Sequence, residues 1–278
     1  LITYVLDQAH YLDKEINDEF SEKVFDTFLE NLDPYKRYFY ASDIEEFSKY
    51  KYLIDDAFKN PNLDFFELVY KRYTKRMLES EKIFNDILSK PFDFNKNEVC
   101  ECDFEELDYV KTKDQLFDRW RKLLKIYVIE NYHNEIEDDL RKSKEDSDFI
   151  LRNPVLIEKK TRETLKETMQ QNYAFISEEM QRSDWFSVYI NSFVSQYDPN
   201  TSYLDPESKD RFDVDMSGNY AGIGARLQKK IDKVEITEVI SGGPAWRDNI
   251  LEKGDAILKV RQDDEDEPVG ILNMRLGE

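Results

Sequence analysis

Glycine is confined to the last quarter of this chain. All eight glycines lie between Gly218 and Gly277, and residues 1–217 contain none. The glycine-free part shows helical periodicity, whereas the remainder shifts to short runs of Val and Ile separated by glycine. A chain of 278 residues is also longer than most single domains. We therefore predict an α+β chain, with a mainly α N-terminal domain at residues 1–212 and a small β-rich domain at residues 213–278.

Apolar residues recur at helical spacing in three long stretches of the first part. The predicted helices run from about Asp64 to Leu88, from about Lys113 to Asn131, and from Leu165 to Met180. Their apolar stripes are typical of a protein core. The charge-rich segment Glu135–Asp148 between the second and third is expected to be a polar helix or a connector.

One pattern occurs twice, at a constant offset of 165 residues. Val24–Pro34 and Tyr189–Pro199 are both apolar helical segments that run into Asp-Pro, and a tyrosine follows each, Tyr38 and Tyr203. Proline lacks an N–H and restricts the preceding residue, so both helices should stop there. The pattern is either a duplication or one physical solution reached twice, and it is predicted to be structural.

The helices that follow these two stops carry start signals. Ser42 with Glu45 three residues later predicts a capping box, and Asp205 followed by Pro206 predicts an N-cap and first helical residue.

Charge and cysteine content exclude several functions. The net charge of −20 disfavours nucleic acid and anionic lipid as partners, because both bind clustered Lys and Arg. The two cysteines, Cys100 and Cys102, are two residues apart, a spacing that does not easily close a bridge in a strand, so no disulfide framework is expected. His10 and His133, the two histidines, are far from that pair in sequence, so a zinc site is not expected.

No stretch approaches the ~18 apolar residues of a membrane span. The chain begins with Leu1 and not with Met, so we expect that a leader or a trimmed stretch once preceded it.

The segment from Tyr220 onward carries the functional signal. Tyr220–Leu227 places two glycines around one apolar residue and leads into a strand, and Lys233–Ile240 alternates as a second strand. Ser241–Trp246 contains Gly-Gly-Pro-Ala and predicts a short helix with Pro244 in its first turn. Leu251–Val260 turns at Gly-Asp and enters a third strand, after which the acidic residues 263–267 predict an exposed hairpin loop.

The glycines around Ile223 indicate a binding site for the end of a polypeptide. Without Cβ atoms, successive backbone N–H groups can turn inward and hold a terminal carboxylate. The following strand, around Ala225 to Gln228, would offer its edge to an extended peptide. The predicted peptide-binding residues are Gly222, Ile223, Gly224, Ala225, Arg226 and Leu227. Arg226 is a candidate for a charge contact with the bound tail, with a plain surface position as the alternative.

The order of these motifs resembles a PDZ domain. The run Asp198–Leu204 and the segments Leu32–Pro34 and Tyr38–Ile44 further resemble the C-terminal processing peptidases, in particular the bacterial tail-specific branch. The resemblance implies peptide-bond hydrolysis by a serine nucleophile with a lysine base, without metal or cofactor. It also implies capture of apolar protein C-termini by the PDZ domain, with an adaptor protein left open as a further partner, and a location in the bacterial periplasm.

The chain departs from that family in one respect. The family's Ser and Lys lie after the PDZ domain, and this chain ends at Glu278, before the helix that would complete the peptide groove. We therefore expect a PDZ domain that is incomplete at its C-terminal end, peptide recognition without catalytic residues, and no activity for this chain alone. The alternatives are a non-catalytic helical scaffold that presents a PDZ-like module, and an acidic helical protein that binds basic partners.

Overall fold

The computed structural model describes residues 4–6, 10–12, 14–146, 148–217, 222–229, 233–261 and 268–271. The chain divides into two compact units, Leu1–Tyr203 and Leu204–Glu278. The predicted boundary after residue 212 falls inside helix α9 (Pro206–Ser217), which belongs to the second unit. The division precedes this helix because residues 201–205, which join it to the first unit, form no regular secondary structure.

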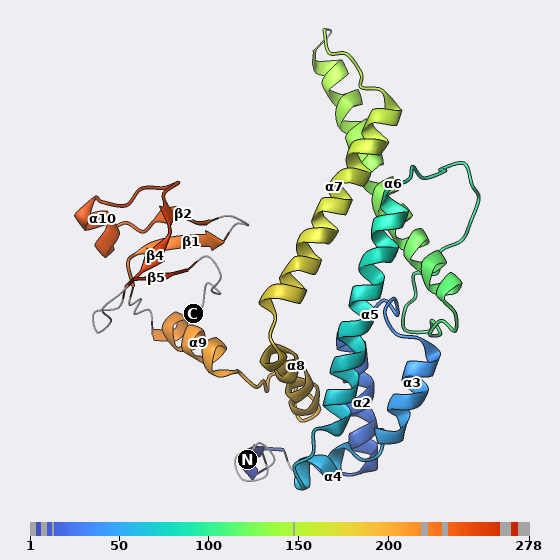
Figure 1. The fold of residues 1–278 in the computed structure, drawn as a ribbon, viewed down its shortest axis with the longest axis vertical. Helices are drawn as coiled ribbons and strands as arrows, with labels where there is room; N and C mark the ends of the chain where they lie inside the picture. Colours follow the sequence, from blue (N-terminus) through green and yellow to red (C-terminus); the bar gives the residue numbers. More distant parts are fainter. Residues whose placement is uncertain are drawn as a thin grey trace. The chain divides into compact units, whose positions relative to one another are not determined.

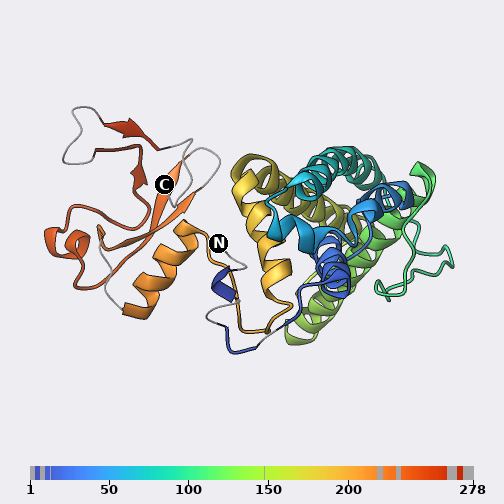
Figure 2. The same cartoon turned by 90° about the horizontal axis from the view of Figure 1, so that it is seen from below.

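The first unit is helical, as predicted. It contains α2 (Asp18–Leu32), α3 (Ala41–Phe47), α4 (Ile54–Lys59), α5 (Asp64–Leu88), α6 (Lys113–Glu145), α7 (Pro154–Ala174) and α8 (Arg182–Val194). The long helices α5, α6 and α7 run along the unit (Figure 1), and Figure 2 views them from below, close to their axes. No helix of the described residues is both long and apolar enough to span a bilayer.

The helix predictions differ in how well their ends agree with the structure. The predicted helix Asp64–Leu88 is confirmed with both ends as α5. Helix α6 continues beyond Asn131 to Glu145, so the charge-rich segment is largely helical. The prediction of a helix reaching Met180 was wrong in its last turn, because α7 ends at Ala174 and a π-helical turn, Phe175–Glu179, follows it.

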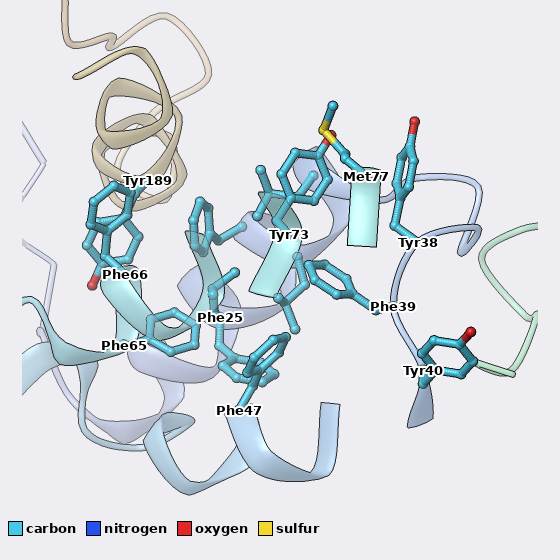
Figure 3. Packing of buried hydrophobic residues seen from close by; sticks show 14 of the residues in the cluster. Phe25, Tyr38, Phe39, Tyr40, Phe47, Phe65, Phe66, Tyr73, Met77 and Tyr189 are labelled. Carbon is cyan, nitrogen blue, oxygen red and sulfur yellow. The ribbon is translucent and has the colours of Figure 1, made fainter. Parts of the chain in front are cut away.

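The core of the first unit is built largely from aromatic rings of α2, α5 and α8 (Figure 3). The Phe28 ring lies 5.9 Å from that of Phe65, 6.5 Å from that of Phe66 and 5.0 Å from that of Tyr189, measured between centroids. Aromatic pairs at these separations add to the stabilisation from burial.

An ion-paired cluster ties the short helix α3 to the long helix α5. Asp43 of α3 has a buried side chain, and its carboxylate accepts bidentate hydrogen bonds from Arg76 of α5, both 2.8 Å long, and a further one from Arg72. Asp43 also accepts from the backbone N–H of Tyr40 at 3.0 Å, so it caps the start of α3. The predicted capping box of Ser42 and Glu45 was therefore wrong, since the N-cap of α3 is Tyr40, two residues earlier.

The N-cap prediction for the helix after the second Asp-Pro agrees with the structure. Helix α9 begins at Pro206, and the Asp205 carboxylate accepts from the backbone N–H of Ser208 at 3.0 Å. This bond satisfies one of the free donors of the first turn.

The second unit combines short strands with helices α9 and α10 (Pro244–Asp248). Strands β1 (Ala225–Lys229), β2 (Val234–Val239) and β3 (Ala256–Ile257) form an antiparallel sheet in the order β1-β2-β3. Strands β4 (Lys259–Val260) and β5 (Val269–Gly270) form a second, two-stranded sheet. The predicted single strand after Gly254-Asp255 is thus split at Leu258 between two sheets. The predicted acidic hairpin loop at residues 263–267 lies outside the described residues.

Candidate functional site

The loop before β1 contains a glycine in a backbone conformation that other residues rarely adopt. Gly224 has a φ of +75°, a left-handed conformation that favours glycine. Its carbonyl accepts from the N–H of Ile240 at 2.8 Å, and the carbonyl of Ile223 accepts from the N–H of Ala245 at 2.8 Å. Both carbonyls therefore face the end of β2 and the start of α10.

A close contact between two glycines holds this loop in place. A Cβ on Gly224 would lie 2.9 Å from the Cα of Gly243, and a Cβ on Gly243 would lie 3.0 Å from the Cα of Gly224. Neither position has room for a side chain. Gly222 differs, because a Cβ there would have no heavy atom within 4 Å. The motifs Gly-Ile-Gly and Gly-Gly-Pro, distant in the sequence, are therefore two halves of one backbone arrangement.

Strand β1 leads directly out of this loop and lies at the edge of its sheet among the described strands. It pairs with β2, Ala225 opposite Val239 and Lys229 opposite Val234, with a register shift between Arg226 and Leu227. An edge strand presents unpaired N–H and C=O groups that can pair with another extended chain. Among the described strands, β1 is hydrogen-bonded to β2 alone, which is the arrangement that addition of a peptide strand requires.

The side chains of the predicted site alternate along β1. Ala225 and Leu227 are half-buried, Arg226 is exposed, and Ile223 before the strand is 45% exposed. The guanidinium of Arg226 lies 3.3 Å from the Glu238 carboxylate on the neighbouring strand, and both side chains are exposed. Such a surface pair contributes little free energy, so it would exchange readily for a ligand carboxylate.

The structure brings all six predicted residues into one continuous loop and strand. A hollow of about 450 Å³ lies elsewhere in the unit, between β2 and α10, and none of the six lines it. Its lining includes Val239, Trp246 and Leu251, and Trp246 is 55% exposed. Sequence reasoning missed this hollow. A tryptophan directly after Gly-Pro-Ala was the available signal, because tryptophan is enriched at binding surfaces.

Within the described part of the chain, no group of three His, Cys, Asp or Glu residues could hold a metal ion. Lys125 has a buried side chain, but it lies in the first unit, where its Nζ donates to Glu98 at 2.7 Å and to the carbonyl of Lys96 at 3.4 Å. The described residues of the site therefore offer backbone hydrogen bonding and apolar surface for binding.

Comparisons with known proteins agree on one family. A family model described as the tail specific protease N-terminal domain matches residues 2–207. The tail-specific protease of Haemophilus influenzae is 28% identical over 261 residues, which cover 92% of this chain and 34% of that protein. A probable CtpA-like serine protease of Staphylococcus aureus strain MRSA252 is 43% identical over 82 residues, 29% of this chain and 16% of that protein. The chain thus spans about a third of the Haemophilus relative.

Proposed function

Because this chain belongs to the tail-specific protease family, we propose that it is the part of such a protease that selects substrates by their C-terminal ends. The second unit acts as a PDZ module. An extended protein tail pairs with the open edge of β1, and its terminal carboxylate is held by backbone N–H groups of the loop at Gly222–Gly224.

The observation that carries this proposal is the contact between Gly224 and Gly243, which fixes a left-handed loop immediately before an edge strand. A carboxylate site made of backbone amides needs such a fixed loop, because amides that must first be ordered bind with a loss of entropy. Half-exposed Ile223 and the neighbouring Leu227 offer an apolar surface to the last side chains of the tail.

Hydrolysis itself is assigned to residues outside these 278. We infer a serine nucleophile with a lysine base there, acting without metal or cofactor, in a hydrolase of the bacterial cell envelope. The chain described here binds tails and is inactive alone, and protein C-termini, with or without an adaptor protein, are its partners.

Peptide binding tests the proposal directly. A fluorescein-labelled peptide that ends in apolar residues with a free carboxylate is titrated against this chain, beside a twin peptide with an amidated end. Loss of a hydrogen-bonded charge costs about 1.5–3 kcal/mol, so the amide should bind about 10- to 100-fold more weakly. Equal binding of the two peptides contradicts the carboxylate site.

Two loop variants separate the site from the fold. Gly224→Val combines a φ of +75° with a clash against Gly243, and it should abolish binding while the helical circular dichroism stays unchanged. Gly222→Ala is the matched control, because its Cβ meets open space and it should bind as the original chain does. Binding that survives Gly224→Val shows that the loop assignment is wrong.

A further inference from the structure

The connection between α5 and α6 carries the chain's two cysteines close together. Cys100 and Cys102 are free thiols, the first half-buried and the second exposed. They lie in a segment without regular secondary structure, so the strand geometry that made a bridge difficult does not apply.

The Cys-Glu-Cys segment curls back on itself. The Glu101 carboxylate accepts from the backbone N–H groups of Cys102 at 3.0 Å and Asp103 at 2.9 Å. The Cys102 Sγ lies 3.8 Å from the carbonyl of Cys100, and the Cys100 Sγ lies 3.8 Å from the carbonyl of Glu101. Cys102 is near enough to Cys100 to raise the pKa of the Cys100 thiol.

Contacts on both sides hold this segment in place. Before it, the Glu98 carboxylate accepts from Arg121 at 2.9 Å and from the buried Lys125 at 2.7 Å, both on α6. After it, the Phe104 ring meets the Tyr35 ring edge-on, with 5.1 Å between centroids. Because the backbone is fixed at both ends, little conformational freedom remains to be lost when the thiols join.

We propose that Cys100 and Cys102 form a thiol–disulfide exchange site that reacts with cationic or neutral disulfides. The Cys102 thiolate attacks the external disulfide, forming a mixed disulfide and releasing one external thiol. The Cys100 thiolate then attacks the Cys102 sulfur, closing the Cys100–Cys102 disulfide and releasing the second external thiol. The protein loses two protons and two electrons, and the external disulfide gains them as two thiols.

The order of attack follows from exposure. Cys102 is accessible to a large reagent, whereas Cys100 is half-buried and burial raises the pKa of its thiol, with the neighbouring Cys102 adding to that effect. Closure of so short a ring removes little entropy from the unfolded chain. The bond is therefore reversible and is not a structural cross-link.

The charge around the pair selects the reagent. Carboxylates surround the two thiols in sequence, at Glu98, Glu101, Asp103, Glu105 and Glu106. Of the groups on α6, Lys122 lowers and Asp118 raises the pKa of Cys100, and Arg119 also interacts with the Cys100 thiol. Glu98 is already paired with Arg121 and Lys125, so attraction of a cationic disulfide and repulsion of an anionic one depend on Glu101, Asp103, Glu105 and Glu106.

Reaction with three small disulfides tests the proposal. Cystamine is cationic, hydroxyethyl disulfide is neutral and oxidised glutathione is anionic, and intact mass is followed for each at low salt. We expect the protein to lose two hydrogens without a retained adduct, with cystamine reacting about tenfold faster than oxidised glutathione. Added salt should reduce that ratio, because screening weakens the attraction.

Variants identify the role of each sulfur and of the charge. Cys100→Ser should stop at a mixed disulfide on Cys102, and Cys102→Ser should react more slowly because Cys100 is half-buried. Asp103→Asn with Glu106→Gln should reduce the preference for cystamine, with unchanged circular dichroism as the control for folding. A stable adduct on the original chain, or equal rates for cystamine and oxidised glutathione, would overturn the proposal.

Discussion

The side-chain amide of Asn31 donates a hydrogen bond to the hydroxyl of Ser192 over 3.1 Å, joining α2 to α8. A second bond joins α2 to the residues directly after α8, from the amide of Gln196 to the hydroxyl of Thr27 over 3.0 Å. The sequence offset of 165 residues relates Asn31 to Gln196 and Thr27 to Ser192. Each bond is therefore the counterpart of the other, and the repeated segments pack against each other with local pseudo-twofold symmetry.

This symmetry predicts matching energies for the two bonds. In double-mutant cycles, Asn31→Ala with Ser192→Ala and Gln196→Ala with Thr27→Ala should give similar coupling energies of about 0.5–1 kcal/mol. Urea unfolding followed by circular dichroism measures them. Coupling in one cycle and none in the other would contradict the equivalence of the two contacts.

The aromatic core predicts a large effect for a single truncation. Phe28 is 1% exposed and contacts rings of α5 and α8, so Phe28→Ala leaves a cavity that costs about 3–5 kcal/mol. Phe175→Ala is the control, because Phe175 is 57% exposed and its loss should change the free energy of unfolding by less than about 1 kcal/mol. Similar melting temperatures for both variants would show that Phe28 is not a core residue.

The Asp43 cluster predicts both a stability loss and a pH dependence. Burial opposes ionisation of Asp43, but hydrogen bonds from Arg76, the Tyr40 N–H and Arg72 hold the pKa of its carboxyl below the usual range. Asp43→Asn removes the charge partner of two arginines and should cost about 3 kcal/mol at pH 7. Glu79, which also pairs with Arg76 but has a side chain that is 36% exposed, provides the control, since Glu79→Gln should cost less than about 1 kcal/mol.

The sign of the pH effect follows from the direction of that shift. A carboxyl whose folded pKa lies below its unfolded value of about 3.9 stabilises the protein above that pH, and the stabilisation is lost as the pH falls through the folded pKa. The free energy of unfolding of Asp43→Asn should therefore fall less steeply below about pH 4 than that of the original chain. Parallel curves in acid would exclude Asp43 as a source of this dependence.

Asp33 lies at the end of α2, just before the first Asp-Pro proline. We expect its hydrogen bonds to contribute more to the free energy of unfolding than its charge does. Burial raises the pKa of its carboxyl, although its oxygens accept from the backbone N–H groups of Arg37 at 2.7 Å, Tyr38 at 2.9 Å and Phe39 at 3.0 Å. In Asp33→Asn an amide NH₂ must face at least one of these donors. The variant should lose about 1–3 kcal/mol despite the relief of a buried charge.

Exposed Glu30, on the same helix, supplies the comparison for Asp33. Glu30→Gln should leave the midpoint of thermal unfolding within the error of the measurement, because surface changes of this kind are small. A stabilised Asp33→Asn chain would mean that the cost of burying the charge exceeds the value of the three hydrogen bonds.

Helices α5 and α6 differ in how much of their length the sequence could predict. Helix α5 was predicted with both its ends, because its apolar residues recur throughout at helical spacing. The charge-rich end of α6 has no such spacing. It is held by Arg152, whose Nε donates to both oxygens of the buried Asp139 at 2.9 Å, a contact between residues on either side of a turn.

The start of α3 was likewise not predictable from local spacing, because a contact with a distant helix determines it. Ser42 and Glu45 fit the spacing of a capping box, yet Asp43 caps the helix because Arg72 and Arg76 of α5 already hold its carboxylate in place. Likewise, Ile257–Val260 alternates as one strand, but its residues pair with different partners, Ile257 with Val234 and Val260 with Val269.

The sequence by itself determined the class of each half, the positions of the long helices and the loop that precedes β1, because periodicity and glycine placement act over neighbouring residues. Tertiary structure alone decided that Gly224 rests on Gly243, that α2 and α8 pair through equivalent residues, and that the boundary between the units precedes α9. These relationships join residues far apart in the chain. Their free energy comes from close packing and from hydrogen bonds that form once the chain has folded.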